Sequence, residues 1–157
     1  IEELEALPAA PAPAAPAPVL EAGAIRAALD AMEAAQVLNQ ETRAVHAAAW
    51  AGPDGGLRLL REDVGRHNAL DKLIGAALRR GGSAAEGFLL ITSRCSFEMV
   101  EKAAAFGARS LVAVSAPTSL ALERARALDM TLLALARRDS VTVFHGAGRG
   151  VGPECPS

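Results

Sequence analysis

Ionisable and amide side chains are concentrated around one glycine in segment 62–72, which reads EDVGRHNALDK. Arg66 could hold a phosphate or carboxylate through its two-pronged guanidinium, and Lys72 could hold the same groups as a point charge. His67 could donate, accept or shuttle a proton near neutral pH, and Gly65 would let a ligand approach the backbone closely. The segment alone is equally consistent with an anion-binding site and with an ordinary charged helix start.

Two further polar segments follow apolar runs that are typical of buried strands. Segment 92–96 contains Arg94 and ends at Ser96, and segment 115–119 contains Thr118. Ser and Thr here are typical helix N-caps, and the free backbone amides of a helix start also attract anions. For Ser96, capping alone is a sufficient explanation. In an open parallel sheet such loops gather at the carboxyl ends of the strands, where ligands bind, so together they predict a site for a ligand with several phosphates.

The two cysteines of the chain, Cys95 and Cys155, are too few for a disulfide framework. Cys95 lies beside an arginine near an expected helix start, a setting that lowers a thiol pKa and favours thiolate. The alternative is a small cysteine that fills space in the core. Packing is the stronger interpretation, and Cys95 is kept as a weak candidate for a reactive role.

A histidine in a strand-like run, His46, invites comparison with zinc nucleobase deaminases, which carry His-x-Glu followed by Pro-Cys-x-x-Cys. Ala48 occupies the position of the glutamate, and the chain has no such cysteine pair. A zinc ligand set and a general acid/base are therefore missing at this position, which argues against deamination.

Expected helices and strands alternate along most of the chain. The predicted helices cover 22–40, 68–80, 96–106 and 118–128, and the predicted strands cover 42–50, 57–62, 88–91, 111–114, 131–135 and 141–144. The turn sequence GPDGG at 52–56 predicts a hairpin. Continuous aliphatic strands that alternate with helices predict an α/β fold of three layers, α/β/α, with a mainly parallel sheet.

Composition limits the organisation of the 157 residues. Five of the nine prolines fall in residues 1–19, which predicts a Pro/Ala-rich linker, an α/β domain over 20–145 and a disordered Gly/Pro-rich tail over 146–157. With 16 basic and 18 acidic residues, a nucleic-acid surface that works by bulk charge is not expected. No membrane span or secretory signal is expected either, so the cytoplasm is the default compartment. Because the chain begins at Ile1, we expect a fragment or a processed product.

Four ordered blocks, at 45–49, 62–72, 93–102 and 115–121, resemble the FdhD family of formate dehydrogenase accessory sulfurtransferases. The resemblance covers about residues 36 to 145. It implies a cytoplasmic, typically dimeric sulfur carrier with a fold related to the cytidine deaminases but without zinc. Such a protein accepts sulfur from a cysteine desulfurase as a persulfide. It passes the sulfur to the molybdenum cofactor, in its bis(molybdopterin guanine dinucleotide) form, for insertion into formate dehydrogenase.

The resemblance also separates binding from sulfur chemistry. The persulfide-bearing Cys-x-x-Cys of the family is expected upstream of the Pro/Ala-rich stretch, so no catalytic residue is assigned in this chain, which we expect to be inactive alone. A GDP-like nucleotide is expected to bind. The candidate cofactor-binding residues are His46, Arg66, His67, Lys72, Ser93, Arg94, Ser115, Thr118, Leu135, Ala136, Arg137, Arg138, Asp139 and Ser140. The alternative function is a non-catalytic scaffold or chaperone domain that binds the cofactor or formate dehydrogenase.

Overall fold

The computed structural model describes residues 20–36, 45–81, 87–137 and 140–146. The predicted linker and most of the predicted tail lie outside these residues. The elements are α2 (Ala22–Ala35), β1 (His46–Ala51), β2 (Leu57–Asp63), α4 (Arg66–Arg80), β3 (Phe88–Ile91), α5 (Phe97–Phe106), β4 (Ser110–Ala113), α6 (Ser119–Ala127), β5 (Thr131–Ala134) and β6 (Thr142–His145). Each predicted helix and strand is present among the described residues, with shifted boundaries at several ends. Residues 37–40 of the first predicted helix and 42–44 of the first predicted strand lie outside the described residues.

The six strands form one sheet in the order β2-β1-β3-β4-β5-β6. Only the pairs β3–β4 and β4–β5 are parallel, while β1 runs antiparallel to both β2 and β3, and β6 runs antiparallel to β5. The predicted α/β class is confirmed, but the sheet is mixed and not mainly parallel. For the pair β1–β2 the reason is local, because the 52–56 turn reverses the chain within a few residues and permits only an antiparallel neighbour, whereas the helical crossovers produce the parallel centre.

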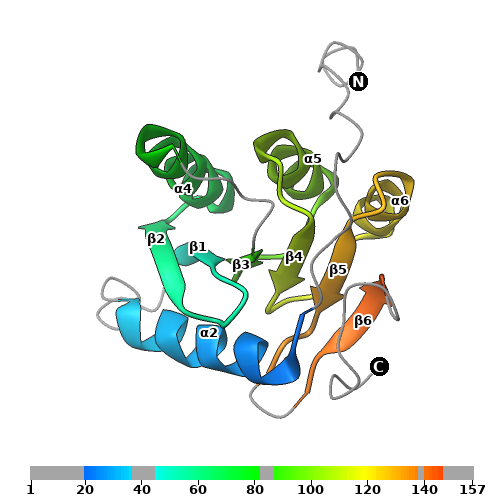
Figure 1. Ribbon diagram of the computed structural model, residues 1–157. Coiled ribbons are helices and arrows are strands. Elements are labelled where there is room, and N and C mark those ends of the chain that lie inside the picture. Colours follow the sequence, from blue (N-terminus) through cyan, green and yellow to red (C-terminus); the bar gives the residue numbers. More distant parts are fainter. Residues whose placement is uncertain (1–19, 37–44, 82–86, 138–139, 147–157) are drawn as a thin grey trace.

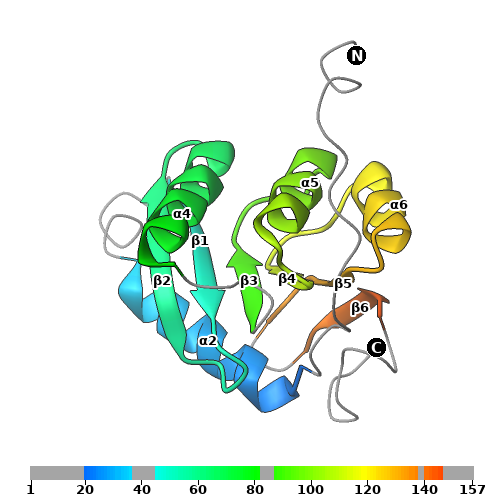
Figure 2. The same cartoon turned by 45° about the horizontal axis from the view of Figure 1, so that its top comes forward.

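Helices cover both faces of the sheet, as the predicted three layers require (Figures 1 and 2). The face under α4, α5 and α6 buries a cluster that includes Leu70, Leu73 and Met99. The face under α2 buries a second cluster that includes Ile25 and Phe88. Short alanines on β1 and α2 allow this single helix to pack closely on the sheet, and they form much of the second cluster.

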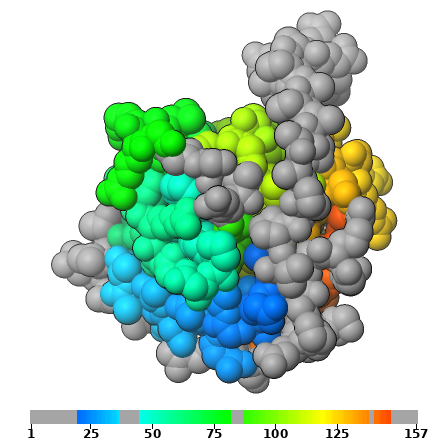
Figure 3. All heavy atoms as spheres, in the orientation of Figure 1, coloured from blue at the N-terminus to red at the C-terminus, as the bar shows by residue number. Residues whose placement is uncertain are grey.

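The hairpin turn packs directly against α2. Gly55 has φ +89°, and a Cβ built there would lie 2.2 Å from the carbonyl oxygen of Ala24. Only glycine satisfies both the left-handed backbone and the close approach. Figure 3 shows the result on the surface, where the atoms of α2 and of the hairpin adjoin each other. The turn therefore helps to fix the position of α2 over the sheet.

Strand direction brings most of the polar loops to one edge of the sheet. Because β2 and β3 both run antiparallel to β1, strands β2, β3, β4 and β5 end at the same edge, and β1 begins there. The loops after β3 and β4 are joined at this edge: Cys95 N–H donates to the Ala116 carbonyl at 3.3 Å, and Thr118 N–H donates to the Cys95 carbonyl at 2.9 Å. At the edge where the sequence predicts ligand binding, the loops after β3 and β4 are thus hydrogen-bonded to each other.

Candidate functional site

A cavity of about 580 Å³ lies at this edge, on the face of the sheet that α2 covers. That volume is within the range of about 300 to 1,000 Å³ typical of small-molecule sites. The lining residues are Leu29, Asp30, Met32, Glu33, Gln36, Val45, His46, Thr92, Val114, Ala136 and Arg137. Three of the predicted cofactor-binding residues, His46, Ala136 and Arg137, therefore meet in one cavity.

The position of Arg137 in the cavity wall is fixed by backbone contacts. Its Nη1 donates to the carbonyl oxygens of Val114 at 2.7 Å and of Ala136 at 2.9 Å. Its backbone N–H donates to the carbonyl of Ser140 at 2.7 Å. A guanidinium carries five N–H donors, and no other hydrogen bond from this side chain to the described residues is present. Arg137 is thus a fixed, exposed cation with donors left for an anionic ligand.

Backbone strain lies immediately before Ala136 and Arg137. Leu135 has φ +55°, a conformation that costs a non-glycine residue about 1 to 2 kcal/mol, and its side chain is 39% exposed. The backbone is held there because Leu135 N–H donates to Ser115 O at 3.4 Å and Ala136 N–H donates to Ala113 O at 3.2 Å. Strained backbone of this kind is common beside functional sites. Here it turns the chain out of β5 and into the cavity wall.

Thr92 connects three strands at the cavity. Its Oγ1 accepts from the backbone N–H of Ala47 at 2.9 Å, and its carbonyl accepts from Ser115 Oγ at 3.0 Å. The predicted residue Ser115 therefore has a positioning role in this structure, holding the end of β4 against the end of β3. Sequence reasoning missed Thr92 as a lining residue, although its place directly after a buried strand was a usable signal.

The residues of α2 that line the cavity, which form its α2 wall, were also missed by sequence reasoning. Asp30, Glu33 and Gln36 follow one another at intervals of three residues, which places them along one side of the helix and its C-cap. They bring carboxylate and amide groups to a cavity whose opposite wall carries His46 and Arg137. The amphipathic pattern of the helix was readable, but nothing in the sequence shows which polar residues border a cavity.

Arg66 and His67 start α4, and neither of them lines the cavity. They act on Glu98, in the first turn of α5. The pKa of Glu98 is held below its usual range by a hydrogen bond from its own backbone amide and, to a smaller extent, by the Ser96 side chain, His67 and Arg66. Arg66 and His67 therefore face an acidic partner between two helix starts, apart from the α2 cavity.

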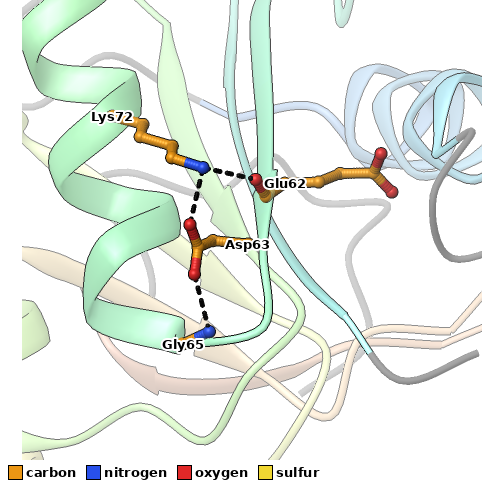
Figure 4. Close-up of polar contacts among 4 residues, drawn as sticks. All are labelled: Glu62, Asp63, Gly65 and Lys72. Carbon is orange, nitrogen blue, oxygen red and sulfur yellow. Dashed lines mark hydrogen bonds and ion pairs between the residues drawn. The ribbon is translucent and has the colours of Figure 1, made fainter.

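Lys72 is held by the junction between β2 and α4 (Figure 4). Its Nζ lies 2.5 Å from Asp63 Oδ2 and donates to the Glu62 carbonyl at 3.3 Å, while Asp63 Oδ1 accepts from Gly65 N–H at 2.9 Å. The pKa of Asp63 is lowered, chiefly by the hydrogen bond from Lys72 and then by the one from Gly65. This geometry gives Lys72 a structural role in closing the turn.

The remaining predicted residues separate into different environments. Ser93 is buried, whereas Arg94 is exposed and makes no hydrogen bond or ion pair with the residues described. Thr118 caps α6 by accepting from Ala121 N–H at 3.1 Å. Ser140 contributes the carbonyl that holds Arg137. Arg138 and Asp139 lie outside the described residues.

Cys95 is fully buried, and burial raises the pKa of its thiol to about 12. The expectation of a lowered pKa beside an arginine and a helix start is therefore wrong in direction. The side chain points into the core formed with α4, α5 and α6, where desolvation of a thiolate outweighs the nearby positive charge. The structure thus agrees with the packing interpretation of Cys95.

The described residues contain neither a metal-binding cluster nor a membrane-spanning helix. No three or more His, Cys, Asp or Glu side chains within this part of the chain come together in a way that could hold a metal ion. Among the described helices, none has the length and apolar character needed to cross a membrane.

Comparison with known proteins gives a consistent result. The sequence profile described as the FdhD/NarQ family matches residues 2–151. The chain is 50% identical over 125 residues to the sulfur carrier protein FdhD of Brucella abortus biovar 1 (strain 9-941), covering 80% of this chain and 46% of that protein. It is 46% identical over 143 residues to the sulfur carrier protein FdhD of Xanthomonas euvesicatoria pv. vesicatoria (strain 85-10), covering 91% and 51%. The chain spans about half the length of these curated relatives.

A solved structure is similar over most of the chain. It is the crystal structure of a protein from Desulfotalea psychrophila proposed to be a formate dehydrogenase accessory protein. The two are 30% identical with a TM-score of 0.82, and the match covers 95% of this chain and 61% of the other.

Proposed function

The chain belongs to the FdhD/NarQ family, and from this premise we propose that it is the cofactor-binding part of a sulfur carrier that serves the maturation of formate dehydrogenase. In this proposal the whole protein accepts sulfur from a cysteine desulfurase as a persulfide. It then delivers the sulfur to the bis(molybdopterin guanine dinucleotide) form of the molybdenum cofactor, which is bound as substrate. The whole protein would act in the cytoplasm as a homodimer.

One observation carries this proposal: the cavity at the carboxyl edge of the sheet is lined by His46, Ala136 and Arg137 together. The last two belong to the segment that the family resemblance assigns to the cofactor. Arg137 presents an anchored cation to a pyrophosphate, and His46 could add a hydrogen bond or a second positive charge. The residues present therefore suit the phosphate-bearing part of such a cofactor.

Cavity size indicates which part of the cofactor would bind. A volume of about 580 Å³ suits one nucleotide-sized group and not an entire bis-nucleotide cofactor. Each chain would therefore hold one guanine nucleotide arm, and the proposed homodimer would supply two cavities. Free GDP should enter the same cavity as a mimic of one arm.

Sulfur transfer itself would require other residues. Cys95 is fully buried and its thiol pKa is raised to about 12, so it is neither accessible nor ionised near neutral pH. We therefore propose that the persulfide is carried by cysteines outside this chain, and that this domain holds and orients the acceptor.

An experiment in cells tests this function. Full-length protein is expressed in cells that lack their own FdhD, and formate dehydrogenase activity is measured for the parent, for replacement of the family Cys-x-x-Cys by serines, and for Arg137→Gln. We expect strong loss in both variants and normal activity in the matched surface control Arg79→Gln. Full activity without the cysteine pair would contradict sulfur transfer and would favour a non-catalytic scaffold.

A further inference from the structure

The outer edge of β2, called here the β2 edge, is the longer of the two edges of the described sheet. β2 lies at one end of the strand order and has seven residues, whereas β6, at the other end, has four. An edge strand presents N–H and C=O groups with which a strand of another molecule can pair, and proteins protect long edges with charged side chains or a covering element. The β2 edge therefore needs such protection more than the β6 edge does.

The strand register shows which backbone groups of β2 face outward. Ala47 directs both of its backbone groups to the β3 side of β1, because its N–H donates to Thr92 Oγ1 at 2.9 Å and its carbonyl accepts from Thr92 N–H at 3.1 Å. Ala47 lies opposite Glu62, and Ala49 lies opposite Leu60. Opposed residues of an antiparallel pair alternate between bonding to each other and facing away. The N–H and C=O groups of Glu62 and Leu60 therefore point away from β1, to the open edge.

Cationic side chains donate to carbonyls at alternate residues of the β2 edge. The three contacts are Lys72 Nζ to Glu62 O at 3.3 Å, Arg61 Nη1 to Leu60 O at 2.7 Å, and Arg80 Nη1 to Arg58 O at 3.3 Å. The first of them is drawn in Figure 4. The carbonyls that a neighbouring strand would use as acceptors are thus already bonded to positively charged groups.

Two of these cations come from one side of α4, which packs against β2 (Figures 1 and 2). Lys72 and Arg80 are eight residues apart, about 12 Å along the helix, and their acceptors on Glu62 and Arg58 are four residues apart, about 13 to 14 Å along the strand. Ala76, midway between the two cations, is only 4% exposed, so this side of the helix lies close to the sheet. The matching spacings allow one helix to protect both ends of the strand.

We propose that Arg61, Lys72 and Arg80 close the β2 edge to strand pairing with a second copy of this chain. An antiparallel pair of β2 edges would bring the same three cations of both copies together, and like charges that face each other across strands are destabilising. It would also displace these cations from the carbonyls that the incoming N–H groups need. Without the cations, the outward-facing backbone groups are free to pair. This property of the fold is independent of the proposed function.

Sedimentation velocity of the 157-residue chain tests the proposal. The double variant Arg61→Gln/Arg80→Gln removes two of the cations and leaves the ion pair at the β2–α4 junction in place. With increasing concentration, its average mass should rise to about twice that of the parent or more. The control Arg79→Gln/Arg126→Gln removes the same charge from exposed ends of α4 and α6, and it should keep the mass of the parent at every concentration.

Hydrogen exchange locates the new contact. In the associated double variant the amide proton of Leu60 should exchange about tenfold or more slowly than in the parent at the same concentration, because it becomes hydrogen-bonded to the second copy. Arg80→Gln alone, at the exposed end of α4, should show a weaker form of the same association, so the result does not depend on the half-buried Arg61. Variants that keep the mass of the parent, or that associate without slower exchange at Leu60, would show that these cations do not close the β2 edge.

Discussion

The ammonium group of Lys72, on the second turn of α4, lies 2.5 Å from the Asp63 carboxylate at the end of β2. The pair closes the β2–α4 junction together with the hydrogen bond from Gly65 N–H to the same carboxylate. It shows that charged residues of segment 62–72 serve the fold, while the cavity residues come from five other places in the chain.

This pair predicts a pH-dependent contribution to stability. The pKa of Asp63 is lowered in the folded state, so its contribution is present above the unfolded pKa and lost as the pH falls through the folded pKa, below about pH 4. Lys72→Met should lower the urea midpoint at pH 7, and the difference from the parent should shrink toward pH 3. Arg79→Met, on the exposed end of α4, is the control. An equal difference at both pH values would argue against the ion pair.

Because the hairpin turn approaches α2 closely, we expect alanine to have opposite effects on stability at two glycines, one in this turn and one in α4. Gly55→Ala should destabilise the protein by about 2 kcal/mol or more, because φ is +89° and the new Cβ would meet Ala24 O. Gly75→Ala, in the interior of α4 with no contact closer than 4.0 Å, should stabilise it by about 0.5 to 1 kcal/mol. Chemical denaturation measures both, and a tolerated Gly55→Ala would show that the turn is not packed as described.

The buried position of Cys95 predicts that its thiol is unreactive in the native protein. With Cys155 replaced by serine, native protein at pH 8 should react with a thiol reagent far more slowly than unfolded protein, because the Cys95 thiol is buried and its pKa is raised to about 12. Cys95→Ala should reduce stability by about 1 kcal/mol through lost packing. Rapid stoichiometric labelling of the native state would contradict the buried position.

The left-handed backbone at Leu135 predicts that glycine at this position increases the stability of the protein. Leu135→Gly should remove strain of about 1 to 2 kcal/mol and add an unfolded-state entropy cost of about 0.4 to 1 kcal/mol. We expect a net stabilisation of about 0.5 kcal/mol in chemical denaturation, since the side chain is partly exposed and leaves little cavity. Substitution by valine serves as the opposite control, because a β-branched residue is least tolerant of positive φ. Destabilisation by glycine equal to that by valine would show that strain is absent.

Much of the fold could be read from local signals. The strand β3 matches its predicted bounds because FLLI is a continuous apolar run, and α5 ends where Gly107 takes φ +97°. The hairpin followed from its Gly- and Pro-rich turn. The antiparallel insertion of β1 beside β3 did not, because pairing between strands distant in sequence depends on tertiary packing.

The site was only partly readable for a related reason. Strand order predicts which loops share an edge, but not on which face of the sheet their side chains lie. Arg137 and His46 line the cavity beside α2, whereas Arg66 and His67 lower the pKa of Glu98 between α4 and α5. The α2 residues could not be assigned because their role depends on where the helix packs, which the contact between Gly55 and Ala24 helps to set.

Calorimetry with GDP tests the central claim most directly. The parent chain should bind GDP with one site per chain. Arg137→Gln should weaken binding about tenfold or more, because it removes a charge-assisted contact to phosphate. Charge reversal at Arg66 should leave affinity within about twofold, because Arg66 does not line the cavity. Absence of GDP binding, or loss of binding through Arg66 and not Arg137, would contradict a cofactor cavity between α2 and the carboxyl edge of the sheet.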